Sequence, residues 1–519
     1  MLFNSYIFIF LFLPIVLLGF YWIGLTKSNR IAAAWLVASS LFFYGWWNPA
    51  YLILIIGSIL FNYSLSTVML TKVDRPQKKL LLTFGITINL AVLGYFKYTN
   101  FFVQNLNILV NSNIALETII LPLAISFFTF QQIIYLVNTY RDETLGHSFL
   151  HYTLFVTFFP QLIAGPIVHH KEMLPQFVKS KLYKLKAKNL SIGISIFSIG
   201  LFKKVVLADG VAVYSTPVFD AAEIGAVLTF FEAWCGALAY SLQLYFDFSG
   251  YSDMAIGLAR MFGVRLPLNF NSPYKATSII DFWRRWHITL SRFLRDYLYI
   301  PLGGGRKGGI RRFTNLMLTM LLGGLWHGAG WAFVLWGTLH GIYLVINHSW
   351  RMLLVSSEPG RLRRVVYWVL TMLAVVVAWV PFRAESLDAT FQLLVAMFGG
   401  NGLSLPVSML GGLAESETWL ASYGVVFKGM FSNGLISDRK LCILWIGILI
   451  LIATLFPNTQ QITYRCGRAF ETYKDEIPRL RYRWMEWRPT LFWAFYSSIA
   501  LSCAIVCINK VSEFLYFQF

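Results

Sequence analysis

Long apolar segments recur along almost the whole chain and constrain its fold more than any other feature. A transmembrane helix needs about 20 mostly apolar residues. Stretches of this kind lie at 6–24, 31–47, 50–70, 80–97, 116–138, 189–208, 225–246, 331–347, 365–383, 440–456 and 490–508. Three more, 150–168, 247–262 and 313–326, are interrupted by Pro, Gly or acidic residues, so we expect re-entrant or half-spanning helices there. The pattern predicts an all-α polytopic membrane protein with about 11–14 transmembrane and re-entrant helices.

The composition agrees with a location in the bilayer. Only 13% of the 519 residues are charged, 57% are hydrophobic and the mean hydropathy is +0.61. A soluble domain carries about 25% charged residues. The first span follows no basic segment and precedes no small-residue cleavage site, so we interpret it as a retained helix and not as a signal peptide.

The net charge of +19 reflects membrane topology. Positive residues gather in short loops after the first and third spans, at Lys27, Arg30, Lys72, Arg75, Lys78 and Lys79. Because basic loops stay in the cytoplasm, the N-terminus is expected outside. We therefore expect a lipid bilayer as the partner of this chain, and no nucleic acid. The five cysteines show no metal-ligand spacing, so no metal site is expected.

Two histidines in apolar surroundings are the main candidates for chemistry. His327 stands in Leu-Leu-Gly-Gly-Leu-Trp-His-Gly-Ala-Gly at 321–330. Ionisable groups at membrane depth are costly, and imidazole is well suited to moving protons near neutral pH. The glycines let backbone or ligand approach closely, although small residues also serve close helix packing, so both explanations stay open.

His287 lies in a predicted amphipathic helix at 281–299. A step of 100° per residue places it on the apolar arc, opposite Arg284, Arg285, Arg292 and Arg295. The histidine therefore points inward, either as a functional group or as a core residue that donates one hydrogen bond.

Further candidates surround the histidines. Basic residues that would meet the phosphates of a donor are Arg284, Arg285, Arg292, Arg306 and Lys307. Much of this charge also fits a topology signal and contact with lipid headgroups. Candidates to line a cavity for substrate are Gln161, Asp247, Tyr251, Ser252, Asp253, Trp283, Trp286 and Trp326. The polar members of this set interrupt apolar segments, where irregular backbone is tolerated next to a cavity.

Four motifs together resemble the membrane-bound O-acyltransferase (MBOAT) family, in its bacterial polysaccharide branch. They are Pro-Gln-Leu-Ile-Ala-Gly-Pro at 160–166, Tyr-Phe-Asp-Phe-Ser-Gly-Tyr-Ser-Asp at 245–253, Phe-Trp-Arg-Arg-Trp-His at 282–287 and Gly-Gly-Leu-Trp-His-Gly at 323–328. The opening residues 1–14 and the closing residues 514–519 resemble members that act in alginate acetylation.

The resemblance implies a ring of helices around a central tunnel. It implies a single integral-membrane domain over 1–519, with N-terminal helices at 1–140, a catalytic core at 141–350 and C-terminal helices at 351–519. His327 would be the catalytic histidine, acting as general base. His287 would position the acceptor or stabilise the oxyanion.

The activity implied by the resemblance is a membrane O-acetyltransferase. It would lie in the bacterial inner membrane and move an acetyl group outward from cytoplasmic acetyl-CoA. The acetyl group would serve O-acetylation of an exopolysaccharide, with alginate as the leading candidate. Acetyl-CoA would be a substrate, no permanent cofactor is expected, and periplasmic acetyltransferase proteins would be partners.

Several alternatives stay open at this point. The polymer could instead be cellulose, or the transfer could be of D-alanine to teichoic acid. A polytopic transporter or a non-catalytic scaffold for polymer export would also fit. The last two predict that His327→Ala leaves transport or polymer acetylation intact.

Overall fold

The computed structural model describes residues 1–25, 28–71, 74–144, 146, 148–306, 308–353, 360–409, 417–466, 480, 483–508 and 515. Lys27, Lys72, Lys307 and most of the closing motif at 514–519 lie outside the described residues. Helices dominate, and the strands in the described part are the short parallel pair β1 (Leu403–Ser404) and β2 (Val425–Val426). The predicted all-α class is confirmed.

Apolar helices make up the N-terminal part of the structure. They are α1 (Leu13–Leu25), preceded by the π-helical segment η1 (Phe8–Phe12), then α2 (Asn29–Gly45), α3 (Tyr51–Leu70), α4 (Arg75–Val110) and α5 (Ile125–Tyr140). Helix α4 has Pro76 in its first turn, where a missing N–H costs nothing. It ends at Asn111, whose left-handed backbone (φ 49°) is a common helix stop.

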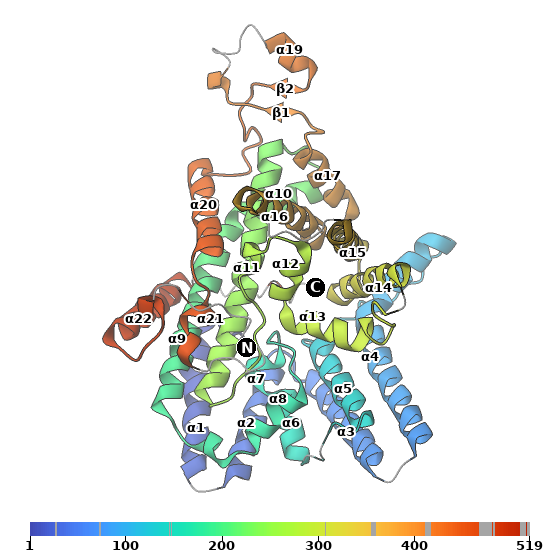
Figure 1. The fold of residues 1–519 in the computed structure, drawn as a ribbon, viewed down its shortest axis with the longest axis vertical. Coiled ribbons are helices and arrows are strands. Elements are labelled where there is room, and N and C mark those ends of the chain that lie inside the picture. The colour runs from blue at the N-terminus through green and yellow to red at the C-terminus, as the bar shows by residue number, and fades with distance from the viewer. Residues whose placement is uncertain are drawn as a thin grey trace.

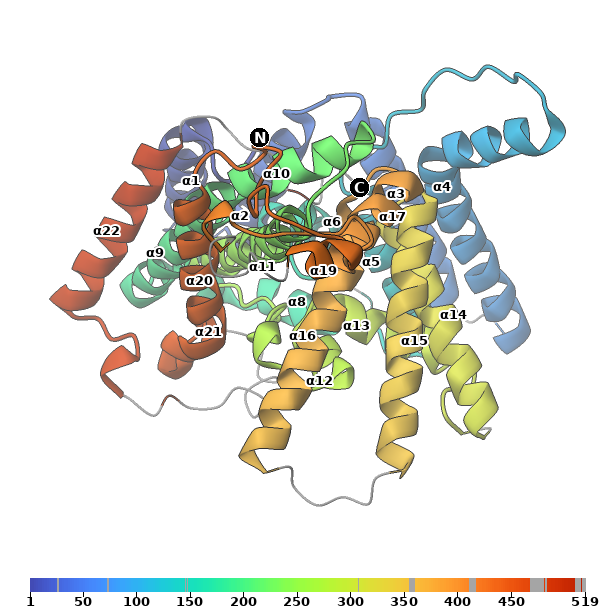
Figure 2. The same cartoon turned by 90° about the horizontal axis from the view of Figure 1, so that it is seen from above.

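The middle of the chain forms the centre of the molecule. It contains α6 (Phe149–Thr157), α7 (Phe159–Leu162), α8 (His170–Phe177), η2 (Ser180–Tyr183), α9 (Ala187–Phe202), the π-helical η3 (Lys203–Ala208), α10 (Asp209–Glu223) and α11 (Phe230–Met261). The segment 150–168 is broken as expected, because the chain turns at Phe158 before Pro160. Helix α11 runs along the long axis of the molecule in Figure 1 and is seen nearly end-on in Figure 2.

The expectation that the helix is broken at 247–262 is wrong, because α11 continues to Met261. Its glycines serve close packing against α9. A Cβ on Gly250 would lie 2.7 Å from the carbonyl oxygen of Gly200, and one on Gly257 would lie 2.7 Å from that of Gly193. Small residues on both helices thus let the two backbones approach closely, as they do in membrane bundles.

The remaining helices follow in order along the chain. They are η4 (Pro273–Lys275), α12 (Ile279–Arg285), α13 (Ile288–Leu294), the π-helical η5 (Arg295–Tyr299), α14 (Gly309–His327), α15 (Trp331–Leu353), α16 (Arg361–Arg383), α17 (Leu387–Met397), η6 (Val407–Met409), α19 (Glu417–Ser422), α20 (Arg439–Leu455), α21 (Thr459–Ile462), η8 (Tyr464–Cys466), η10 (Arg483–Met485) and α22 (Leu491–Cys507).

Two expectations about these helices are wrong. The single helix predicted at 281–299 is interrupted at Trp286 and His287, where His287 takes a left-handed conformation (φ 43°). The break expected at 313–326 is absent, because α14 is continuous through it.

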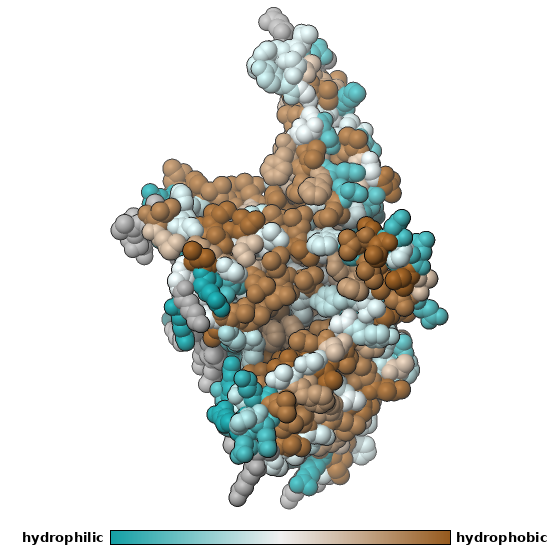
Figure 3. All heavy atoms as spheres, turned by 90° about the vertical axis from the view of Figure 1, so that its right-hand side faces the viewer, coloured by the Kyte–Doolittle hydropathy of each residue, from teal (hydrophilic) through white to brown (hydrophobic). Residues whose placement is uncertain are grey.

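Five described segments are long and apolar enough to cross a membrane: Phe8–Leu25, Tyr51–Leu70, Arg75–Val110, Ala187–Glu223 and Arg361–Arg383. Helices α15 and α16 run roughly along the shortest axis of the molecule (Figure 2). Hydrophobic side chains cover much of the face in Figure 3, and hydrophilic ones gather toward its margins. Large apolar side chains such as Trp22 and Ile53 are exposed. Such a surface suits contact with lipid.

Candidate active site

His327 is the last residue of α14 and is almost fully buried, with 4% of its surface exposed. Three aromatic rings surround its imidazole in edge-on contact. The ring centroids of Trp326 and Trp336 lie 4.9 Å away, and that of Phe382 lies 5.1 Å away. These rings restrict the rotation of the imidazole.

His327 is also among the residues that line a small cavity. The cavity has a volume of about 80 Å³. Its walls come from α4, from the loop and first turn at 121–127, from 163–164 after α7, and from the end of α14. Lys97 and Ser126 supply polar side chains to this wall. The space admits a small polar group but not a sugar ring.

The glycines around His327 are explained by close packing of α14 on α15. A Cβ on Gly324 would lie 2.3 Å from the carbonyl oxygen of Phe333, and one on Gly337 would lie 2.4 Å from that of Met320. A Cβ on Gly328 would clash with the Phe333 ring at 2.1 Å. Of the two explanations left open by the sequence, the structure thus supports helix packing, which fixes the α14–α15 turn beside His327.

His287 sits in the bend between α12 and α13, and its imidazole is held by Asn269. The His287 Nδ1 lies 3.1 Å from the Asn269 Oδ1. That oxygen also accepts hydrogen bonds from the backbone N–H of Thr289 at 3.3 Å and from its hydroxyl at 2.9 Å. Because a backbone N–H can only donate, the accepting atom is the amide oxygen. The His287 Nδ1 therefore carries a proton, and its Nε2 is the basic nitrogen.

The sequence analysis missed Asn269. Asn269 is fully buried and lies in the irregular segment after α11. The only sign of Asn269 in the sequence is the stretch Asn-Phe-Asn-Ser-Pro at 269–273, which by itself predicts a turn. Only the tertiary contact with His287 gives it a role.

Trp326 brings the two histidines into one cluster. Its ring centroid lies 6.3 Å from that of His287 and 4.9 Å from that of His327. The positive or titratable groups of Lys97, His287 and His340 are close enough to act electrostatically on His327. The two histidines predicted from separate motifs thus share one site.

The other predicted tryptophans belong to the aromatic packing around this cluster. The Trp283 Nε1 donates to the His340 Nδ1 at 3.3 Å. Trp286 stacks on Phe282 with ring centroids 5.6 Å apart. Trp283 also lines a large cavity described next, whereas Trp286 does not.

A basic cavity of about 880 Å³ lies on the α12–α13 side of the histidines. Its lining includes the predicted donor residues Arg284, Arg285 and Arg292, together with Arg295. Hydrophobic side chains of α13 and α14, Leu294 and Met320, form its apolar wall. The cavity therefore combines positive charge with an apolar surface.

Carboxylates neutralise most of these arginines. The Arg285 Nε lies 2.9 Å from Asp281, and the Arg292 Nη1 lies 2.6 Å from Glu172. The Arg295 Nε lies 2.7 Å from Asp296. Arg284 is exposed and forms no ion pair within the described part of the chain. Its guanidinium is thus the one best able to receive a phosphate.

The remaining basic candidates are placed differently. Arg306 is exposed in the turn after η5 and does not line the basic cavity. Lys307 lies outside the described residues.

A third, polar cavity of about 330 Å³ shares Arg292 with the basic cavity. Its lining also includes Arg141, His169 and Tyr297. Burial, followed by the nearby positive charges of Arg292, His170 and Lys171, lowers the pKa of His169 to about 3. His169 is therefore neutral at physiological pH, and the cavity carries the positive charges of Arg141, Lys171 and Arg292 beside the carboxylates of Glu143 and Asp296.

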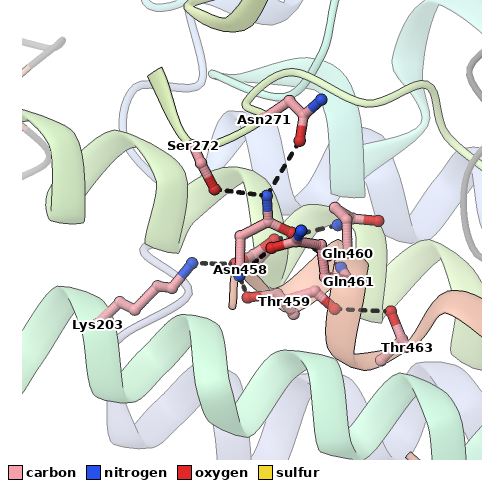
Figure 4. Close-up of polar contacts among 9 residues, drawn as sticks. Lys203, Asn271, Ser272, Asn458, Thr459, Gln460, Gln461 and Thr463 are labelled. Atoms are coloured by element: carbon pink, nitrogen blue, oxygen red, sulfur yellow. Dashed lines mark hydrogen bonds and ion pairs between the residues drawn. The ribbon is translucent and has the colours of Figure 1, made fainter. Parts of the chain in front are cut away.

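The two predicted aspartates form ion pairs with π-helical segment η3. The Asp247 Oδ1 lies 2.6 Å from the Lys204 Nζ, and the Asp253 Oδ2 lies 2.7 Å from the Lys203 Nζ. The Thr459 hydroxyl also donates to Asp253 at 2.6 Å. Figure 4 shows Lys203 and Thr459 converging from η3 and α21 on this point. These contacts anchor the segment around α21 to the core.

The other polar candidates also make internal contacts. Tyr251 stacks on Phe3 with ring centroids 4.8 Å apart. The Ser252 hydroxyl accepts from Asn269 at 3.4 Å, and the Gln161 amide donates to the carbonyl of Phe155 at 2.6 Å. Neither these three residues nor the two aspartates line the cavities beside the histidines. A continuous tunnel through the bundle stays a prediction.

Known proteins similar to this chain share one family. The model of MBOAT, the membrane-bound O-acyltransferase family, matches residues 76–381. The chain is 47% identical over 432 residues to a peptidoglycan O-acetyltransferase of Helicobacter pylori, which covers 78% of this chain and 81% of that protein. It is 44% identical over 440 residues to a probable alginate O-acetylase AlgI of Pseudomonas putida, with 83% and 87% covered.

A more distant relative is the teichoic acid D-alanyltransferase of Streptococcus thermophilus. It is 29% identical over 240 residues, which is 44% of this chain and 57% of that protein. The matched region of the family model contains both histidines and the whole α12–α14 region.

Proposed function

Because this chain belongs to the membrane-bound O-acyltransferase family and is an acyltransferase of the membrane, we propose that it takes an acetyl group from cytoplasmic acetyl-CoA. The group passes through the bacterial inner membrane for O-acetylation of an extracytoplasmic polysaccharide, with alginate as the first candidate. Periplasmic acetyltransferase proteins would complete the transfer to the polymer.

The observation that carries this proposal is that the two histidines, joined by Trp326, lie next to two different cavities. His327 is among the residues that line the small cavity, and Ile288, the residue after His287, lines the large basic cavity. The phosphates of coenzyme A cannot enter hydrocarbon, so they need a charged site at its edge. Arg284 offers such a charge, and the apolar wall of Leu294 and Met320 would receive the pantetheine arm.

The chemistry follows from the burial of the two imidazoles and from the tautomer of His287. His327 would remove the proton of an acceptor hydroxyl as its oxygen attacks the thioester carbonyl. The carbon–sulfur bond then breaks, and the thiolate of coenzyme A takes up a proton. His287 has its Nδ1–H committed to Asn269. Its Nε2 would accept a hydrogen bond, which supports the role of positioning the acceptor over that of oxyanion donor.

The test is turnover of acetyl-CoA by purified protein. We expect His327→Ala to lower kcat about 100-fold or more, because it removes the general base. We expect Arg284→Gln to raise the KM for acetyl-CoA about tenfold with kcat unchanged, because one charged hydrogen bond to a phosphate is lost. Loss of the thioester is followed with acetyl-labelled substrate.

Arg306→Gln is the matched control for Arg284→Gln, because Arg306 is exposed and lies outside the basic cavity. Turnover by the His327→Ala protein at the wild-type rate would contradict the proposal. That result would favour a transporter or an export scaffold.

Peptidoglycan is the second candidate polymer, because the Helicobacter pylori relative that acts on it is 47% identical to this chain. Membranes that contain the enzyme and its partners are supplied with labelled acetyl-CoA and with either alginate or peptidoglycan. The polymer that receives base-labile label decides between the two.

A further inference from the structure

Lys97 is a buried ionisable side chain that the mechanism above does not use. It lies in α4, inside a segment long and apolar enough to span a membrane, and only 9% of its surface is exposed. It forms no ion pair with any carboxylate in the described part of the chain. An ammonium group in this setting is costly and needs another source of compensation.

The compensation comes from the end of α14. The Lys97 Nζ donates to the carbonyl oxygen of His327 at 2.9 Å and also to that of Trp326. The hydroxyl of Tyr98 donates to the carbonyl oxygen of Leu325 at 2.8 Å. The last carbonyls of a helix have no donors within the helix, and its C-terminus carries about half a negative charge. Two successive residues of α4 therefore cap three successive carbonyls of α14.

The cap acts on the backbone of His327 itself. After His327 the chain leaves the helix, because Gly328 is extended (φ −157°). Lys97 therefore fixes the backbone carbonyl of His327, the last residue of the helix and the one that carries the imidazole. Its ammonium also lies 5.9 Å from the ring centroid of Trp326, the ring between the two histidines. Lys97 and His327 line the same small cavity.

We propose that Lys97 is a positioning residue for acyl transfer: by capping α14 it fixes the direction in which His327 presents its imidazole to the cavity. The inference rests on the proposed function of His327. A displacement of about 1 Å in a reacting group lowers a rate about 100-fold. The effect of losing Lys97 is therefore expected in kcat, and not in the binding of acetyl-CoA on the far side of the histidines.

The test compares Lys97→Met, Lys97→Arg and Asn105→Ala with wild type. We expect Lys97→Met to lower kcat about 10- to 100-fold with the KM for acetyl-CoA changed less than about twofold. Lys97→Arg, which keeps a charged donor, is expected to recover most of kcat. Asn105 is on the same helix and accepts from Trp331 at 2.8 Å, after the turn, so Asn105→Ala is the matched control with near wild-type kcat.

Equal kcat in Lys97→Met and wild type would overturn the proposal. A kcat of Lys97→Arg no higher than that of Lys97→Met would also overturn it, because both losses would then come from disturbed packing. Should Lys97→Met not fold, Lys97→Leu is measured by the same criteria, because it also removes the donor.

A second measurement separates this proposal from the proposed function. Diethyl pyrocarbonate modifies imidazoles, and mass spectrometry gives the rate at His327 without any need for turnover. We expect this rate to change about threefold or more in Lys97→Met, because the ring is released from one orientation. If wild type does not consume acetyl-CoA, the proposed function fails, and an unchanged labelling rate would then overturn the role of Lys97 as well.

Discussion

At the scale of single residues, the side chains that hold a functional group matter as much as the group. His287 is fixed by one amide oxygen of Asn269, and that oxygen is itself oriented by the backbone of Thr289. The same logic applies to Asp253, whose carboxylate is paired with Lys203 and bonded to Thr459. Acidic residues in an apolar segment are therefore not evidence of a substrate cavity by themselves.

Replacing Asn269 with Ala tests the role of the amide oxygen. The imidazole of His287 would lose its fixed tautomer, so we expect kcat to fall about 10- to 100-fold. Removing the hydrogen-bond partner that orients a metal-binding histidine has an effect of this size. The KM for acetyl-CoA should stay unchanged. Steady-state kinetics of the purified variant measure both. Ser252→Ala is the control, because it removes only the weak 3.4 Å contact of the Asn269 amide nitrogen; equal losses in both variants would argue against a tautomer effect.

At the scale of elements, glycines determine how closely helices pack. Gly250 and Gly257 set α11 against α9, and Gly324 and Gly337 set α14 against α15. In the second pair the close approach positions the turn that follows His327. The same residue type that weakens an isolated helix therefore supports a continuous one when a second backbone lies against it.

Gly324→Ala tests this packing at the candidate active site. The added Cβ would lie 2.3 Å from the carbonyl oxygen of Phe333, so α14 and α15 must separate. We expect a loss of about 1–3 kcal/mol in stability, typical of overpacking, together with a clear loss of activity. Thermal unfolding in detergent and turnover of acetyl-CoA measure the two effects.

Gly323→Ala is the matched control one residue away. Its Cβ would meet only the flexible end of Leu294, at 3.3 Å. In a helix, alanine is favoured over glycine, so we expect stability to be unchanged or slightly raised. Similar destabilisation by both substitutions would mean that close helix approach is not the reason for Gly324.

At the scale of the whole molecule, the start of α4 and the segment after α5 lie next to each other. Asp142, after α5, lies 2.7 Å from Lys78 at the start of α4. This hydrogen bond lowers the pKa of Asp142. The contact joins the start of α4 to the segment after α5, as expected for two helices that cross a membrane in opposite directions. The positive-inside pattern predicts that these segments lie on the cytoplasmic side.

Sealed membrane vesicles test the assigned orientation. Acetyl-CoA is charged and does not cross a bilayer, so inside-out vesicles should consume it without detergent. Right-side-out vesicles should consume it only after permeabilisation. Thioester loss is measured in both, with His327→Ala vesicles as the background. Equal activity in intact vesicles of both orientations would contradict a donor site that opens only to the cytoplasm.

The sequence by itself determined the class of fold and the two histidines. Apolar length fixes that the chain is helical in a membrane, because an unbonded backbone group in lipid is too costly. The cost of placing an imidazole in an apolar segment makes His287 and His327 candidates for chemistry, together with the motifs around them. Neither conclusion depends on which segments meet.

Only the tertiary structure decided what surrounds those histidines. The continuity of α11 and α14, the bend at His287 and the roles of Asn269 and Lys97 all arise from contacts between distant segments. In the sequence, a glycine that breaks a helix and a glycine that admits a neighbouring backbone look the same. A buried lysine or asparagine likewise acquires a function only when the carbonyl or imidazole that it bonds is brought to it by the fold.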